Sequence, residues 1–300
     1  MSANSTKSIY FALGANSSIA VAKSFAAWIT GSGAMLAEAI HSFADSGNQL
    51  LLLLGLKQAG KPSDESHPLG YGKSTYFWSF IVALILFSMG GMFSLYEGIH
   101  KLQHPTELVK PEWAIGVLIF AIIAEGISMW GALREIRKVQ YGRPLWRWFR
   151  ESRQSELIVV FGEDLAALVG LVLALAAIVA TIITGNPAWD AMGTIAIGVL
   201  LLLIAIAIGV EVKELLIGES ADPVIKKEML HFLHQQEAVA EVYNLITLQM
   251  GGDIMVAVKA RMSGTNEADT MIENINQIER SFRSRFREVK WLFFEPDNRD

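Results

Sequence analysis

The chain contains no cysteine and few charged residues. None of its 300 residues is a cysteine, which excludes disulfide bonds and thiolate metal sites. Only 18% of the residues are charged, against about 25% in a typical soluble domain. Hydrophobic residues make up 52% of the chain, and the mean hydropathy is +0.36. These proportions indicate a membrane protein, and the net charge of −5 argues against nucleic acid as a partner.

Six stretches are long and apolar enough to cross a bilayer as helices, which takes about 20 mainly apolar residues. Turn-forming residues separate them. The predicted spans cover residues 9–29, 34–56, 76–99, 113–133, 157–183 and 189–212. The first span is rich in small residues and carries Asn16 and Lys23, so we expect it to pack inside the helix bundle.

Basic side chains are concentrated in two of the loops. Residues 57–75 hold three lysines and residues 134–156 hold six arginines and one lysine, whereas the loops on the other side hold only Lys101 and Lys110. The positive-inside rule then places the basic loops and both termini in the cytoplasm. We expect no removable signal peptide, and the absence of cysteine and of a transit peptide favours a bacterial inner membrane over an organelle.

The chain changes character after residue 212. Helical patterns begin at the Asp222-Pro223 pair and again at 267–286, and strand patterns cover 239–250, 254–262 and 289–294. The order αββαβ favours a small ferredoxin-like α+β sandwich with its helices on one face. We therefore predict a transmembrane α-helical domain at 1–212 and a cytoplasmic α+β domain at 213–300.

Three ionisable side chains lie in the second predicted span. Such a group costs about 2.5–3.5 kcal/mol at the bilayer centre on insertion scales, so it is kept only where it pairs, hydrates or works. His41 and Asp45 are four residues apart and lie on one helix face. Glu38 precedes His41 by three residues and sits near the same face. This spacing lets an imidazole nitrogen and a carboxylate oxygen bind one cation.

The fifth predicted span carries an acidic pair in an otherwise apolar sequence. Glu163 and Asp164 are adjacent, so their side chains point about 100° apart and are not expected to face one ion equally. A histidine with two or three carboxylates suits a divalent transition metal such as Zn²⁺, Mn²⁺ or Fe²⁺. We predict a metal site formed by His41, Asp45, Glu163 and Asp164.

Other roles for the polar residues stay open. The His41–Asp45 pair could instead tie two helices together, although a second acidic pair nearby needs a proton or a cation. Glu38 is either part of the ligand shell or a helix contact. Glu125, in the fourth span, is either a proton carrier or a polar helix contact, and Asp190 is expected to meet water.

These features, in this order, resemble the cation diffusion facilitators, the divalent-metal/proton exchangers that include the zinc transporters. The resemblance covers nearly the whole chain, from the His/Asp pair of span two to the acidic site of span five. Three further stretches are similar to family motifs: HPLGYGK at 67–73, LYEGIHKLQHP at 95–105 and LLIGESADP at 215–223.

The stretches HSFADSGNQLLLLLG at 41–55 and EDLAALVG at 163–170 are most similar to the branch that contains the mitochondrial zinc exporter of animals. The common family pattern in span five is His-x-x-x-Asp, in which Asp164 matches the aspartate and Val160 stands in place of the histidine. The fourth ligand then comes from Glu163, from Glu38 or from water. An oxygen-richer site also tolerates Mn²⁺ or Fe²⁺.

The resemblance implies a secondary transporter, and no enzyme, that exports divalent cations in exchange for protons by alternating access. Zn²⁺ is the first expectation, with Mn²⁺, Fe²⁺, Co²⁺ and Cd²⁺ as alternatives, and no prosthetic group is expected. A membrane metal sensor that binds without transport is the rival function. The resemblance also implies a homodimer held by residues 213–300.

Two further stretches contain histidines that are candidate metal ligands. A second family-type site would use Asp64 and His67, where Tyr71 replaces the second histidine of the motif. His231 and His234 lie on the first helix of the tail, and we expect them to be ordinary surface residues. No His-Glu-x-x-His motif supports a catalytic zinc.

Overall fold

The structure is a computed structural model that describes residues 3–264 and 267–299. It divides into two compact units. The first unit consists of Met1–Gly55, Trp78–Val139 and Glu156–Val212, and the second consists of Leu56–Phe77, Gln140–Ser155 and Lys213–Asp300.

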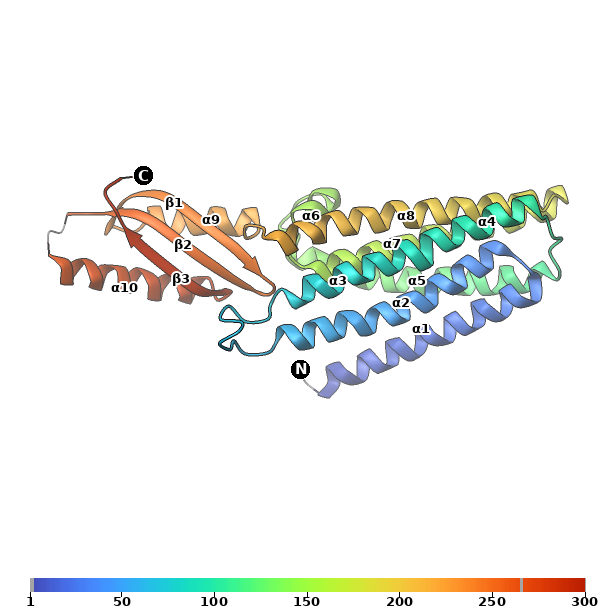
Figure 1. Ribbon diagram of the computed structural model, residues 1–300, viewed down its shortest axis with the longest axis horizontal. Coiled ribbons are helices and arrows are strands. Elements are labelled where there is room, and N and C mark those ends of the chain that lie inside the picture. The colour runs from blue at the N-terminus through green and yellow to red at the C-terminus, as the bar shows by residue number, and fades with distance from the viewer. Residues whose placement is uncertain (1–2, 265–266, 300) are drawn as a thin grey trace. The chain divides into compact units, whose positions relative to one another are not determined.

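Long helices form the first unit, and every predicted span is helical (Figure 1). The helices are α1 (Ala3–Thr30), α2 (Gly33–Ala59), α3 (Ser74–Ile85), α4 (Phe93–Gln103), α5 (Pro111–Val139), α7 (Ser155–Thr184) and α8 (Ala188–Ile217). A π-helical segment, η1 (Leu86–Met92), joins α3 to α4 and was not predicted. Such segments are rare and usually short.

Four helices in the described residues are long and apolar enough to cross a membrane. They are Ser74–Gln103, Pro111–Val139, Ser155–Thr184 and Ala188–Ile217. Helices α1 and α2 occupy the first two predicted spans, and α2 carries the ionisable side chains that lower its hydropathy. The membrane character of four helices is therefore confirmed, whereas the total of six spans stays a prediction.

Glycines allow α8 to pack closely against α4. A side chain at Gly198 would collide with the backbone of Leu95, and one at Gly98 would collide with Ile195. Small residues of this kind let transmembrane helices approach each other. The contact fixes α8 beside α4 within the first unit.

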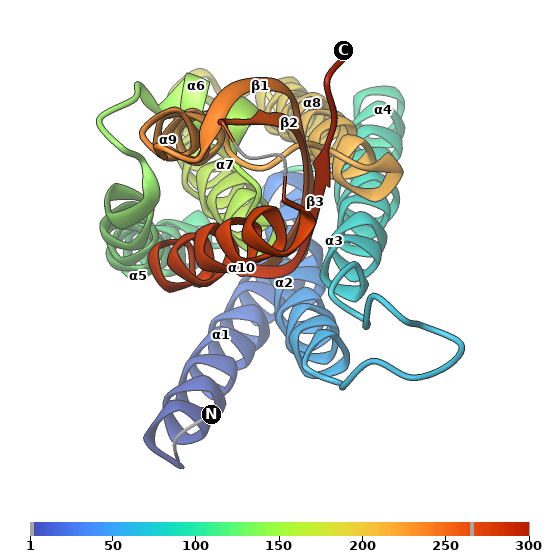
Figure 2. The same ribbon diagram turned by 90° about the vertical axis from the view of Figure 1, so that its left-hand side faces the viewer.

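The second unit contains a three-stranded sheet and two helices that pack on it (Figures 1 and 2). Its elements are α6 (Leu145–Glu151), α9 (Pro223–His234), β1 (Val239–Met250), β2 (Asp253–Met262), α10 (Ala268–Arg285) and β3 (Val289–Pro296). Strand β2 is central, antiparallel to β1 and parallel to β3. The predicted order αββαβ is confirmed for α9 to β3, and helix α6 was not predicted. The assignment to the ferredoxin-like class stays a prediction.

Apolar side chains between the sheet and the two helices form the core of this unit. Phe232 of α9 and Phe282 of α10 meet edge to face, with ring centroids 5.6 Å apart, so both helices lie on one face of the sheet. Asp222 caps α9, because its side chain accepts a hydrogen bond from the backbone nitrogen of Val224 at 2.9 Å. The cap and Pro223 explain why α9 begins where it was predicted to begin.

Candidate metal-transport site

Helix α2 presents His41, Asp45 and Asn48 at intervals of four and three residues, which places them on one face. His41 and Asn48 are fully buried, and the Asp45 side chain is 15% exposed. The His41 Nδ1 and Asp45 Oδ1 atoms are 3.5 Å apart, which is long for a hydrogen bond. The two residues share a helix, so their pairing ties no two helices together.

Helix α7 supplies Glu163 and Asp164, which have different partners. The Asn48 amide of α2 donates a 2.5 Å hydrogen bond to Glu163 Oε1. The Ser128 hydroxyl of α5 donates a 3.1 Å hydrogen bond to Asp164 Oδ2. The adjacent carboxylates therefore point toward different helices, as their angular separation on a helix predicts.

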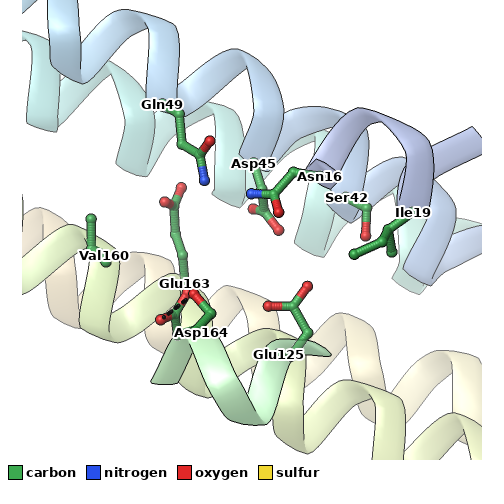
Figure 3. A pocket seen from close by; sticks show the side chains of 10 residues that line it. Asn16, Ile19, Ser42, Asp45, Gln49, Glu125, Val160, Glu163 and Asp164 are labelled. Carbon is green, nitrogen blue, oxygen red and sulfur yellow. Dashed lines mark hydrogen bonds between the residues drawn. The ribbon is translucent and has the colours of Figure 1, made fainter. Parts of the chain in front are cut away.

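A polar pocket gathers three of the four predicted ligands. Figure 3 shows Asp45, Glu163 and Asp164 around it, together with Glu125 of α5. Its volume is about 50 Å³, enough for a few water molecules or an ion at roughly 10–15 Å³ per water. Asn16, Ile19, Ser42, Gln49, Ser128 and Val160 complete the lining. Val160 thus borders the pocket at the position where the family motif has a histidine.

Several buried polar atoms near the pocket lack hydrogen-bond partners. Within residues 3–264 and 267–299, these atoms include both ring nitrogens of His41 and the Oδ1 atom of Asp45. Buried polar groups are normally satisfied, so orphaned atoms call for an explanation. Ligation of a cation would satisfy the imidazole and the carboxylate together.

The structure does not present a preformed metal cage. His41 lies next to Asp45 but is not among the residues that line the pocket. Across the part of the chain that the structure describes, no three histidine or acidic side chains are grouped closely enough to hold a metal ion. The four predicted ligands would therefore need side-chain rotation to bind one ion together.

Glu38 and Glu125 have different environments. The Glu38 carboxylate accepts a 3.1 Å hydrogen bond from Lys23 of α1, and both side chains are fully buried. Glu38 is therefore a helix contact in this structure. Glu125 lines the pocket and points into it from α5 (Figure 3).

The expectation that Asp190 meets water is wrong. Its residue exposure is 2%, and it accepts hydrogen bonds from the Ser32 hydroxyl at 2.5 Å and the Gly33 nitrogen at 2.7 Å. Lys101 lies 3.3 Å from the same carboxylate and also donates to the carbonyl of Gly31. The first residues of α8 are packed against the α1–α2 turn, which removes Asp190 from solvent.

The loop residues Asp64, His67 and Tyr71 interact with one another on the surface. The Tyr71 hydroxyl donates a 2.6 Å hydrogen bond to Asp64, and the backbone nitrogen of His67 donates another at 2.7 Å. The first bond holds the pKa of the Asp64 carboxyl below its usual range and raises the pKa of Tyr71. Asp64 thus has partners within the loop itself. His231 and His234 are exposed on α9, as expected.

Two polar partners of the acidic pair were not predicted from the sequence: Asn48, which donates to Glu163, and Ser128, which donates to Asp164. The spacing of both residues from an acidic side chain could have indicated them. Asn48 is three residues after Asp45, and Ser128 is three residues after Glu125, so each shares a helix face with an acidic residue. The helix that each face meets was not readable from the sequence.

Comparison with known proteins adds a family match. The family described as the cation efflux transmembrane domain matches residues 9–217. The chain is 35% identical over 228 residues to a proton-coupled zinc antiporter, SLC30A9, mitochondrial, of Xenopus laevis, covering 75% of this chain and 41% of the relative. The corresponding human protein is 33% identical over 230 residues, with 76% of this chain and 40% of the relative covered. The chain thus spans about two fifths of the length of these relatives.

A bacterial relative is matched over more of its length. The cation-efflux pump FieF of Escherichia coli O1:K1 / APEC is 24% identical over 267 residues, covering 88% of this chain and 83% of the relative. Metal tolerance protein C4 of Arabidopsis thaliana is 32% identical over 219 residues, covering 72% of this chain and 48% of the relative.

Proposed function

Because the chain belongs to the cation diffusion facilitator family, near the branch of the SLC30A9 zinc antiporters, we propose that it exports divalent transition-metal cations in exchange for protons. Family members move metal cations across membranes and are not enzymes, so the chain is a membrane transporter. Zinc is the proposed first substrate, since the mitochondrial relatives are named as zinc antiporters.

One observation carries the proposal. Asp45, Glu163 and Asp164 come from two helices to one polar pocket inside a set of apolar helices. Carboxylates in a membrane domain are costly and mark ion pathways. His41, fully buried beside Asp45 with both ring nitrogens unpartnered in the described chain, supplies the nitrogen ligand that zinc favours.

Proton coupling follows from the same side chains. Carboxylates and imidazole bind a metal only when deprotonated, so protons compete with the metal for His41, Asp45, Glu163 and Asp164. We propose alternating access: the pocket takes metal from the cytoplasm, the bundle reorients, and protons on the other side displace the metal. Inward proton flow then drives export.

The metal preference depends on the ligand set. Val160 occupies the position of the usual histidine, so a site made of His41 and the three carboxylates is richer in oxygen than a site with two histidines. Oxygen ligands favour harder cations. Mn²⁺, Fe²⁺, Co²⁺ and Cd²⁺ are therefore proposed as alternative substrates.

We also propose that residues 1–212 form the transmembrane domain and that residues 213–300 form a cytoplasmic dimerisation domain. The proposed molecule is a homodimer with cytoplasmic termini. We propose a bacterial inner membrane as the location because the chain contains no cysteine. The relatives in the zinc-antiporter branch, in contrast, are named as mitochondrial proteins.

Reconstitution tests the function. Protein in liposomes that contain a metal-sensitive dye is given Zn²⁺, Mn²⁺, Fe²⁺, Co²⁺ or Cd²⁺ with and without a proton gradient. We expect gradient-dependent flux that Asp45→Ala and Asp164→Ala abolish and that Glu112→Ala, at an exposed position on α5, retains. Normal flux in both pocket variants would contradict the site, and metal binding without flux in the wild type would favour a sensor.

A further inference from the structure

Lys23 is a buried cation that the proposed transport steps leave unused. It lies on α1 with no solvent exposure, and its ammonium donates to Glu38 Oε2 at 3.1 Å and to the Ser42 hydroxyl at 2.7 Å. An ion pair buried in this way is weak evidence for stability, because well-packed apolar residues of similar volume often serve as well or better. Tying α1 to α2 therefore does not by itself account for a buried lysine at this position.

The ammonium lies at the edge of the metal pocket. Ser42, which accepts its hydrogen bond, also lines the pocket, as does Ile19 one helical turn before Lys23. The pocket is rich in carboxyl groups: its lining includes those of Asp45, Glu125, Glu163 and Asp164. A lysine has a flexible four-carbon stem and a mobile point charge. This ammonium thus borders a pocket whose carboxyl groups are possible alternative partners, and three of them are proposed to bind metal.

Glu38 is set in a recess against Gly170 of α7. A β-carbon at Gly170 of α7 would collide with Glu38 Oε1, so the glycine provides the room for this carboxylate. Glu38 Oε1 has no hydrogen-bond partner among the described residues, and its other oxygen binds Lys23. The position of the carboxylate therefore depends on the α2–α7 contact at Gly170.

We propose that Lys23 is a tethered cation that competes with the metal for the pocket and that Glu38 holds its ammonium outside. This inference rests on the proposed function, in that the pocket must bind divalent metal. A shift of α2 against α7 that moves Glu38 from its recess frees the ammonium to reach Asp45 and displace the metal. Lys23 and Glu38 are positioning residues in this scheme, and neither is a metal ligand.

The test is whether removal of the Lys23 charge restores the metal affinity that is lost when Glu38 is neutralised. Zn²⁺ binding to the purified full-length protein is measured by isothermal titration calorimetry for the wild type, Glu38→Gln and Lys23→Met/Glu38→Gln. Glu38→Gln should weaken Zn²⁺ binding by about tenfold or more, because it releases a positive charge toward a divalent cation. The double variant should return close to the wild-type affinity, because the competing charge is gone.

A structural tie between α1 and α2 makes the opposite prediction. If the pair only ties the helices, loss of both partners should reduce Zn²⁺ affinity at least as much as loss of one. A double variant that binds Zn²⁺ as weakly as Glu38→Gln would therefore overturn the proposal. Gly170→Ala is a second route, since it keeps both charges and pushes the Glu38 carboxylate out of its recess. It should also weaken binding, and Lys23→Met in that background should restore it.

The controls separate this inference from the proposed function. Ser46→Ala changes a buried residue of α2 whose hydroxyl donates to Ser42 O within the helix, and it should bind Zn²⁺ like the wild type. Size-exclusion chromatography checks folding, and Gly170→Ala carries the test if Glu38→Gln does not fold. If the wild type binds none of the divalent metals, the proposed function is overturned. If the wild type binds Zn²⁺ but Lys23→Met does not restore the affinity lost in Glu38→Gln, only the tethered-cation proposal is overturned.

Discussion

The side-chain amide of Asn48 on α2 donates a 2.5 Å hydrogen bond to the Glu163 carboxylate on α7. Both residues are buried, and 115 positions separate them in the chain. The bond joins the two helices that supply every proposed metal ligand. It also fixes which way Glu163 faces, while Asp164 on the same helix turns to Ser128 of α5.

Asn48→Ala should weaken metal binding without removing a ligand. Outer-shell partners of metal ligands orient them, and their loss typically costs about 10–100-fold in affinity. We expect a loss of this size for Zn²⁺ in calorimetry, together with a loss of stability of about 1–3 kcal/mol, because the buried Glu163 carboxyl loses its donor. Ser46→Ala, one turn from Ser42 on the same helix, is the matched control. Equal affinity of Asn48→Ala and wild type would show that Glu163 needs no orientation by Asn48.

Asp190→Ala should destabilise the helical unit. Asp190 is 2% exposed and holds Ser32, Gly33 and Lys101 around one carboxylate. Its removal leaves the Lys101 ammonium and a backbone donor without their acceptor, and breaking a buried pair on one side costs about 3–5 kcal/mol. Thermal unfolding in detergent measures the effect, with Asp269→Ala on the exposed side of α10 as control. Asp190→Ala with an unchanged midpoint would show that this cluster contributes little.

The helices and strands could be predicted from the sequence because their signals are local. The Asp222-Pro223 start of α9 is a cap formed by neighbouring residues, and the hairpin turn Gly251-Gly252 marks the end of β1. Helix α6 was missed because its seven residues lie in an arginine-rich loop and are too few to show an apolar period.

The contacts within the site could be predicted only in part from the sequence, because they depend on which helices lie next to each other. The spacing of His41 and Asp45 gave a shared face, and the pair Glu163–Asp164 gave diverging directions. Nothing in the sequence paired Lys23 with Glu38, because a helix face does not specify which neighbour it meets. For the same reason Asp190, near a helix end, was expected in water, whereas the α1–α2 turn covers it.

Tyr76→Phe should loosen the β1–β2 hairpin within the second unit. The Tyr76 hydroxyl accepts a 2.9 Å hydrogen bond from the Gly251 nitrogen at the hairpin tip. Its loss leaves a buried backbone donor without this acceptor, which costs about 1–3 kcal/mol. Limited proteolysis should then cut near the tip faster in Tyr76→Phe than in the wild type. Gly72→Ala should act more strongly, because its β-carbon would collide with the Met250 carbonyl.

The salt bridges of Glu151 should make the α6 segment sensitive to acid. The pKa of the Glu151 carboxyl lies below its usual range, mainly because Arg147 donates a hydrogen bond to it. A hydrogen bond from Arg143 acts in the same direction, and desolvation opposes both. A carboxyl with a depressed folded-state pKa stabilises the fold above its unfolded pKa, about 4.3 for glutamate. That stabilisation is lost as the pH falls through the lower folded-state value.

A comparison with Glu151→Gln isolates this effect. The difference in unfolding midpoint between wild type and Glu151→Gln should be constant above about pH 5 and should shrink as the pH falls below about 4. Glu273→Gln, at an exposed position on α10, controls for the loss of one carboxylate from the surface. A difference that persists unchanged to low pH would mean that Glu151 acts through packing or neutral hydrogen bonds, and that its charge contributes nothing to holding Arg143 and Arg147.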